Sequence, residues 1–282
     1  MYNNNYVELK KERDLGAIIS DTFKFLRLEW KPLFSILLKM VLIPVLINFV
    51  LAIYDASDTL TNTSANPLSN FSLISLLIYI IAIGNFYLMS LIINIYIREY
   101  IHTKGNVDRT LVVNDVKKHF LSFAGMGVLT TLIIFVGLIF CFVPGLYLMV
   151  PLSVVGSVYV FQSEEALTSI SNAFTTIKGY WWETFGVVIV VFIILMIAFS
   201  IFSIPSFIYT IIKSATAITE NDITQITSLF TDPVYIFLAL ISAIGQYILY
   251  AVYLIATVFI YFDINERKNA SGAIDKIDNL GN

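Results

Sequence analysis

Long stretches of the chain contain no charged side chain. Residues 71–97, 184–212 and 233–262 lack Asp, Glu, Lys, Arg and His altogether, and residues 32–54 are interrupted only by Lys39. About 20 apolar residues in a helix cross the ~30 Å hydrocarbon core of a bilayer, where each backbone amide must be bonded within its own segment. Each of these four stretches therefore predicts one membrane-spanning helix.

A fifth charge-free stretch, residues 120–163, is too long for one helix. Pro144-Gly145 lies within it. Because Pro removes an amide donor and Gly accepts positive φ, the pattern predicts a tight turn there, between helices over about 120–142 and 146–162. We therefore expect an all-α polytopic membrane protein with six transmembrane helices, forming a single integral membrane domain over residues 1–282.

Lys and Arg are concentrated in alternate connections between the predicted spans. Of the 17, 15 lie before span one, between spans two and three, between spans four and five, or in the tail 263–282. The other connections carry only Lys213, together with five acids: Asp55, Asp58, Glu220, Asp222 and Asp232. Cytoplasmic loops hold the excess of basic residues. Both termini are therefore expected in the cytoplasm, in agreement with an even number of spans.

Residues 14–31 have the spacing of a one-sided helix, with Asp14 placed as its N-cap. The apolar stripe consists of Leu15, Ile18, Ile19, Phe23, Leu26 and Trp30. The charges between these positions would stay in water or at the headgroups, so this pattern predicts an amphipathic helix lying flat in the membrane interface. Pro32 is expected to start the first span.

Residues 164–182 repeat this design, and a shift of 151 positions aligns the two segments. The apolar stripe is Leu167, Ile170, Phe174, Ile177 and Trp181. The identical pairs are Ile19/Ile170, Ser20/Ser171, Phe23/Phe174, Trp30/Trp181 and Phe34/Phe185. We interpret the chain as a duplicated helix–span–span unit with the hairpin of spans three and four inserted. Its expected interfacial anchors are Phe23, Trp30, Phe174 and Trp181.

Composition supports a bilayer protein. Apolar types make up 58% of the 282 residues and charged types 13%, the mean hydropathy is +0.82 and the net charge is −3. Soluble globular chains have about 45–50% apolar and about 25% charged residues. These values exclude a soluble enzyme, a disordered chain and a basic nucleic-acid binder, and the one cysteine excludes a disulfide scaffold. We expect no nucleic-acid partner.

Few residues are candidates for chemistry. The two histidines, His102 and His119, are 17 positions apart and form no metal-binding motif, so no metal, cofactor or catalytic residue is expected. The candidate polar residues within the spans are Lys39, Asn48, Asn85, Asn94 and Gln246. The amides would either bond across helices or line a polar cavity. Lys39 lies near the start of its span, where its side chain would reach the headgroups or contact a lipid phosphate.

Several stretches between residues 142 and 281 resemble a known family. The residues that carry the likeness are Phe142-Val143-Pro144-Gly145-Leu146-Tyr147-Leu148, Glu165-Ala166-Leu167, Ser171, Ile177-Lys178-Gly179-Tyr180-Trp181-Trp182, Phe185-Gly186, Tyr261-Phe262-Asp263-Ile264-Asn265-Glu266 and Ile277-Asp278-Asn279-Leu280-Gly281. They resemble the membrane domain associated in some bacteria with glycerophosphodiester phosphodiesterases, and the tail is similar to stand-alone Bacteroidetes members. The resemblance implies a bacterial inner-membrane location. Phosphodiesterase activity belongs to a separate soluble domain, for which this chain has no room.

Two functions from different classes remain. The first is a non-enzymatic inner-membrane protein that organises membrane lipids or other membrane proteins through its interfacial helices. The predicted cytoplasmic face carries 15 acids against its 15 bases, which argues against simple electrostatic binding to anionic lipids. The alternative is a transporter or permease for a small or lipidic solute, which the repeat and the mid-span amides would favour.

Overall fold

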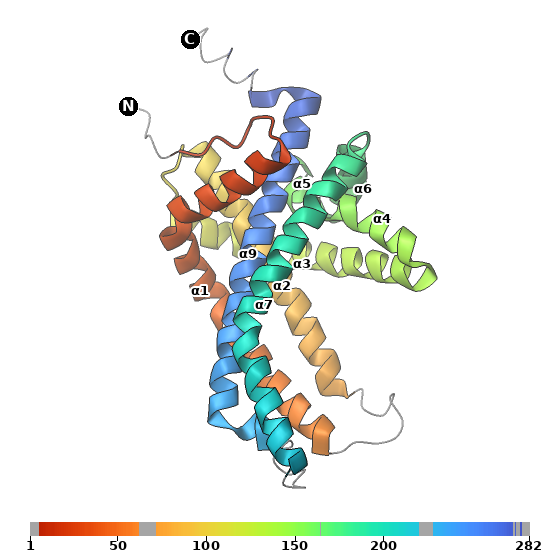
Figure 1. Cartoon of the computed structure of the whole chain (residues 1–282). Helices are drawn as coiled ribbons and strands as arrows, with labels where there is room; N and C mark the ends of the chain where they lie inside the picture. The colour runs from red at the N-terminus through yellow and green to blue at the C-terminus, as the bar shows by residue number, and fades with distance from the viewer. Residues whose placement is uncertain are drawn as a thin grey trace. The chain divides into compact units, whose positions relative to one another are not determined.

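The computed structural model describes residues 6–61, 72–163, 165–219, 228–272, 274 and 277. All the regular structure in these ranges is helical, and six helical stretches are long and apolar enough to cross a membrane. The elements, labelled in Figure 1, are α1 (Leu15–Thr61), α2 (Leu73–His102), α3 (Arg109–Phe140), α4 (Phe142–Leu152), α5 (Val155–Val158), η2 (Tyr159–Ser163), α6 (Ala166–Ile177), α7 (Trp181–Thr219), η3 (Ser228–Thr231) and α9 (Pro233–Asn269). The prediction of an all-α, multi-pass membrane protein is confirmed.

The helices group into two compact units. Unit 1 contains residues 1–40, 87–193 and 251–282, and unit 2 contains residues 41–86 and 194–250. Helices α1, α2, α7 and α9 each contribute one part to each unit, whereas α3, α4, α5 and α6 belong to unit 1 alone.

The first predicted interfacial helix and the first predicted span are one continuous helix, α1, of 47 residues. Asp14 caps it as expected, because its carboxylate accepts a hydrogen bond from the Ala17 amide at 2.7 Å. The expected boundary at Pro32 does not end the helix. Proline removes one backbone hydrogen bond and favours a bend, which neighbouring turns can absorb without ending the helix. In Figure 1 the first turns of α1, in red, run in a different direction from the turns that follow.

The turn between the third and fourth spans lies earlier than expected. Helix α3 ends at Phe140, and the single extended residue Cys141, with φ −169° and ψ 143°, leads directly into α4. Pro144 therefore sits in the first turn of α4, where its missing amide costs nothing. Gly145 has no positive φ. A Cβ at Gly145 would lie 2.4 Å from Cδ2 of Leu138, so Gly145 is needed for close approach of the two helices.

The fourth predicted span is not one uniform helix. Helix α4 ends at Leu152, just after Pro151, and the chain continues through α5 and the π-helical turn η2. Val154, with φ −100° and ψ 3°, separates α4 from α5. The second interfacial segment also divides: α6 ends at Ile177, and α7 starts at Trp181. Beyond the last predicted span, α9 continues as helix to Asn269, into the segment expected to be the tail.

The apolar helices of unit 2 are connected by polar contacts and by one close approach of two helices. The Asp55 carboxylate accepts hydrogen bonds from the Ser72 and Ser75 hydroxyls, joining α1 to α2. Tyr209 on α7 donates to Asp232, which precedes α9, at 2.6 Å. Between the same two helices, a Cβ at Gly245 would meet the Phe202 ring at 2.4 Å, so their backbones approach closely there.

Candidate functional site

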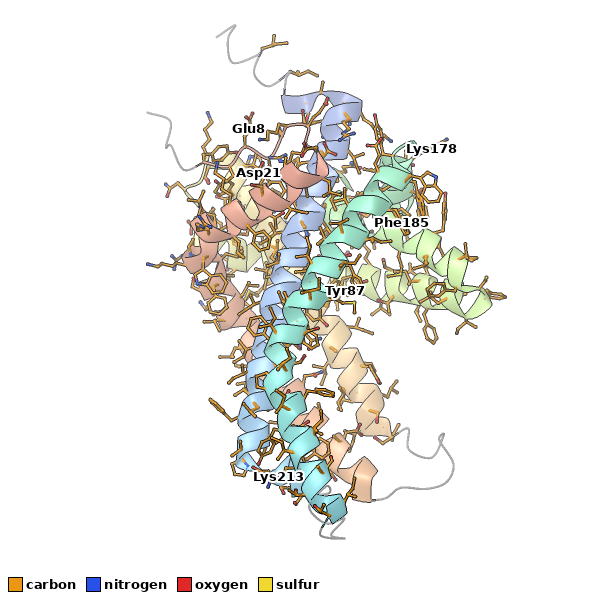
Figure 2. All side chains as sticks on the ribbon, in the orientation of Figure 1. Glu8, Asp21, Tyr87, Lys178, Phe185 and Lys213 are labelled. Atoms are coloured by element: carbon orange, nitrogen blue, oxygen red, sulfur yellow. The ribbon has the colours of Figure 1, made fainter. Side chains whose placement is uncertain are left out.

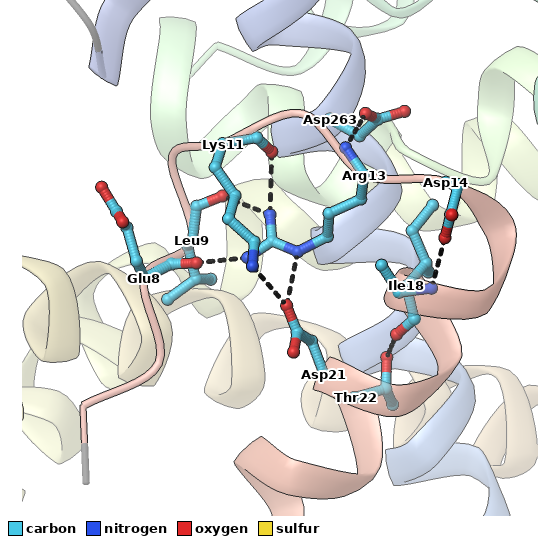
Figure 3. Close-up of polar contacts among 10 residues, drawn as sticks. Glu8, Leu9, Lys11, Arg13, Asp14, Ile18, Asp21, Thr22 and Asp263 are labelled. Carbon is cyan, nitrogen blue, oxygen red and sulfur yellow. Dashed lines mark hydrogen bonds and ion pairs between the residues drawn. The ribbon is translucent and has the colours of Figure 1, made fainter. Parts of the chain in front are cut away.

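Arg13 forms the centre of a buried polar cluster in unit 1 (Figure 3). Its side chain is fully buried, although the residue precedes the first helix. Nε donates to the Asp21 carboxylate at 2.9 Å, and Nη1 donates to the Leu9 carbonyl at 2.7 Å and the Lys11 carbonyl at 3.0 Å. Nη2 donates to the Glu8 carbonyl. One guanidinium therefore folds residues 8–13 against the first turns of α1.

Asp263 and Arg267 on α9 continue this cluster. The Asp263 carboxylate accepts from the Arg13 backbone amide at 2.7 Å and from Nε of Arg267 at 3.1 Å. Arg267 also donates to the Arg13 carbonyl at 2.9 Å and to Glu183 on α7 at 2.7 Å. We call Arg13, Asp21, Glu183, Asp263 and Arg267 the clasp. It joins the N-terminal segment, α1, α7 and the end of α9.

The clasp alters the charge equilibria of its members. Burial raises the pKa of the Asp21 carboxyl, but the hydrogen bond from Arg13 and the charge of Lys11 outweigh this effect and leave the pKa below its ordinary value. Burial lowers the pKa of the Arg13 guanidinium, and the hydrogen bond to Asp21 opposes that change. Both side chains are charged at neutral pH.

A cleft of about 350 Å³ opens beside the clasp. Its polar lining includes Asp14, Glu183, Asp263 and Arg267, and its apolar lining includes Ile18 and Val187. The charged groups at its wall already pair with one another, as described above. Toward the same end of unit 1, Figure 2 shows Glu8, Asp21 and Lys178.

The two predicted interfacial segments bury equivalent positions. In α1 the buried residues include Ile18, Thr22 and Phe25, and in α6 they are Ser169, Ala173, Thr176 and Ile177. The shift of 151 positions pairs Ile18 with Ser169, Thr22 with Ala173 and Phe25 with Thr176. The partners differ, because Phe25 packs edge-on against Tyr96, Tyr100 and Phe259, whereas α6 packs against α3, α4 and α5.

The four predicted anchors form two pairs related by the 151-residue shift. The two phenylalanines differ in exposure, since Phe23 is 45% exposed and Phe174 is half-buried, whereas the two tryptophans stack in the same way. Trp30 stacks on Phe34 with ring centroids 4.6 Å apart, and the equivalent Trp181 stacks on Phe185 at 5.0 Å.

Trp181 makes further contacts. Its ring stacks on Tyr147 of α4 at 5.1 Å, and its Nε1 donates to the Tyr147 carbonyl at 3.2 Å. The neighbouring Trp182 is 77% exposed. Trp181 thus connects the second segment to α4, while the Trp182 indole remains exposed.

The mid-span amides bond mainly to neighbouring helices. Asn48 donates to the Ile78 carbonyl at 2.8 Å and Asn85 to the Tyr247 hydroxyl at 3.3 Å, both within unit 2. In unit 1, Asn94 accepts from the Ser157 hydroxyl at 2.9 Å. Gln246 donates within its own helix, to the Tyr250 hydroxyl at 2.6 Å. These amides therefore act as contacts between or within helices.

Lys39 is exposed on α1, and none of the described residues pairs with its ammonium. Among the residues that the structure describes, no group of three or more His, Cys, Asp or Glu residues could hold a metal ion.

Sequence reasoning missed the clasp. Arg13 and Asp263 are 250 positions apart. Arg13 belongs to no motif, and the family likeness that includes Asp263 indicates no partner for it. The available signal was the amphipathic pattern of residues 14–31, because a charged residue near the buried face of such a helix, such as Asp21, must pair with a group elsewhere in the fold. That pattern does not identify the partners.

Comparison of the chain with protein-family models, with curated proteins and with solved structures gives no match.

Proposed function

We propose that the chain is a non-enzymatic bacterial inner-membrane protein that organises membrane lipids or partner membrane proteins through residues 15–31 and 166–182. The observation that carries this proposal is the exposed aromatic surface of both segments. Each segment buries one helix face on the rest of unit 1 and leaves an aromatic side chain outside, Trp30 in the first and Trp182 in the second. Tryptophan at such positions favours the headgroup region.

The pairing of the mid-span amides favours this proposal over the transport alternative. A transporter would use such amides to line a polar cavity near the middle of the membrane. Here Asn48, Asn85 and Asn94 are engaged by neighbouring helices. The resemblance to the membrane domain associated with glycerophosphodiester phosphodiesterases supports an inner-membrane role without phosphodiesterase chemistry in this chain.

The test is reconstitution of the full chain in nanodiscs of mixed lipid composition. We expect native mass spectrometry to show enrichment of particular lipids, or crosslinking in membranes to capture the same membrane protein in repeated experiments. The Trp30→Ala/Trp182→Ala double variant should reduce that enrichment or capture. Absence of both lipid enrichment and a reproducible partner would refute the proposal.

A further inference from the structure

The acids and bases of the first 26 residues of α1 differ in their surroundings: the acids take part in contacts within unit 1, and the bases are exposed. Residues 15–40 contain two acids, Asp21 and Glu29. Asp21 is engaged by Arg13 at 2.9 Å and by Lys11 at 3.4 Å. Glu29 accepts a hydrogen bond from the Tyr96 hydroxyl of α2. Both carboxylates therefore face the rest of unit 1 and take part in its internal contacts.

The bases of the same residues are all on the outside. Lys24, Arg27, Lys31 and Lys39 are exposed, and no described residue forms an ion pair with any of them. Lys24, Arg27 and Lys31 follow one another at spacings of three and four, and Lys39 lies eight residues further on. These spacings place all four on one side of an α-helix. We call these four residues the cationic face.

Apolar side chains border the cationic face. Phe23, Trp30 and Leu38 are 45%, 37% and 43% exposed, and each directly precedes a base in the sequence, Lys24, Lys31 or Lys39. Lys31 and Lys39 are about 12 Å apart along the helix at ~1.5 Å per residue. This arrangement suits a surface that meets phosphate groups and acyl chains together, because Lys and Arg stems cover apolar surface while their charges reach the phosphates.

The predicted cytoplasmic side has equal numbers of acids and bases, but they are not evenly distributed over its surface. Several of its acids are already committed to protein contacts: Asp14, Asp21, Glu29, Asp108, Asp115, Glu183, Asp263 and Glu266. Equal totals nevertheless coexist with a local excess of positive charge on α1, because Lys24, Arg27, Lys31 and Lys39 are exposed and have no carboxylate partner among the described residues. Local charge, rather than the total, governs attraction within a Debye length of about 8–10 Å.

We propose that the cationic face binds the phosphate groups of anionic phospholipids in the leaflet on the predicted cytoplasmic side. This inference rests on the proposed function and specifies the lipid class that the first segment would recognise. The second segment does not repeat the feature, since the positions equivalent to Lys24, Arg27, Lys31 and Lys39 are Thr175, Lys178, Trp182 and Val190.

Trp30 can report on this contact directly. The chain has three tryptophans, and the Trp181→Phe/Trp182→Phe background leaves Trp30 as the reporter. The full chain in that background is reconstituted in nanodiscs that contain either brominated phosphatidylglycerol or brominated phosphatidylcholine, and quenching of Trp30 fluorescence is measured. We expect stronger quenching by the phosphatidylglycerol.

The test variant carries Lys24→Gln, Arg27→Gln, Lys31→Gln and Lys39→Gln. The matched control removes the same charge from exposed bases elsewhere on the predicted cytoplasmic side: Lys104→Gln, Lys117→Gln, Lys118→Gln and Lys178→Gln. A base near an anionic surface contributes about fivefold in binding. The preference should therefore fall at least about fivefold in the test variant and change less than twofold in the control. If the test variant does not fold, the Lys31→Gln/Lys39→Gln pair should still lower the preference.

The outcomes separate this inference from the proposed function. Equal loss of preference in the test and control variants would overturn the cationic face as a site, because overall charge would then explain the binding. A lipid preference that the test variant leaves unchanged would also overturn it, while the proposed function would stand. Absence of any lipid preference and of any membrane partner in the unmodified chain would refute both.

Discussion

The two segments related by the 151-residue shift, residues 15–31 and 166–182, agree in what they bury and differ in what they expose. Equivalent positions face the interior, and the pairs Trp30/Phe34 and Trp181/Phe185 stack in the same way. The exposed face of the first segment is cationic, whereas the second has an exposed indole, Trp182, beside its stacked pair. The buried pattern is the part common to both segments, and their outer surfaces differ.

The segments also differ in whether the helix continues. The first runs on into the apolar part of α1, whereas the second ends before Gly179, which has φ +93°. The position equivalent to Gly179 in the first segment is Leu28. Leucine disfavours positive φ and is a good helix former, so the helix persists through it. Gly179 thus permits, at positive φ, a break that Leu28 disfavours in α1.

The largest expected effect concerns the attachment of each segment to α9. The first is attached through the buried Arg13, and the second through the exposed Lys268, which donates to the Thr175 carbonyl at 2.9 Å. Arg13→Met leaves Asp21 and several carbonyls without their donor, so we expect a loss of about 3–5 kcal/mol in stability. Lys268→Met should cost less than about 1 kcal/mol. Thermal unfolding in detergent measures both, and similar losses would show that burial of Arg13 is not decisive.

The next effect concerns the two stacked tryptophans. Trp181→Ala removes the stack on Phe185 and the contacts with Tyr147, so we expect a loss of about 2–3 kcal/mol. Trp30→Ala removes a more exposed ring stacked on Phe34 and should cost about 1 kcal/mol. Unfolding midpoints of the two variants, compared in the same detergent, give the order. Equal losses would mean that the contact with α4 contributes no stability.

The helix break in the second segment provides a smaller effect. Gly179→Ala places a side chain at positive φ, and although open space surrounds the added Cβ, we expect a cost of about 1–2 kcal/mol. Gly186 is the matched control, since it lies in α7 and its Cβ would also meet no atom within 4 Å. Gly186→Ala should be neutral or should stabilise by up to about 1 kcal/mol. Destabilisation by both substitutions would show that φ at position 179 is not the cause.

The smallest effect is a pH dependence confined to the first segment. The pKa of Asp21 is lower in the folded state than its ordinary value of about 3.9, so the carboxylate contributes stability above that pH. The contribution is lost as the pH falls through the folded-state pKa. Asp21→Asn should lower the unfolding midpoint at pH 7 and reduce its decline below about pH 4. An unchanged acid decline in this variant would exclude Asp21 as a cause.

Several features of the fold could be read from the sequence because they depend on neighbouring residues. The charge-free stretches predicted the apolar helices, and Asp14 was recognisable as an N-cap because its partner is only three residues away. Boundaries were less predictable. Pro144-Gly145 indicated a turn, but the chain reverses at Cys141, because Pro fits the first turn of α4 and Gly145 allows its close approach to Leu138.

The sequence by itself determined the number of apolar helices, because hydropathy and helical spacing are local properties; the amphipathic segments and the alignment that relates them stay predictions. Only the tertiary structure decided which charges pair. The contact of Arg13 with Asp263 and that of Glu29 with Tyr96 join distant parts of the chain. Since burial commits these groups to one another, the bases left outside on α1 become a local positive surface, although the charge total on the predicted cytoplasmic side is balanced.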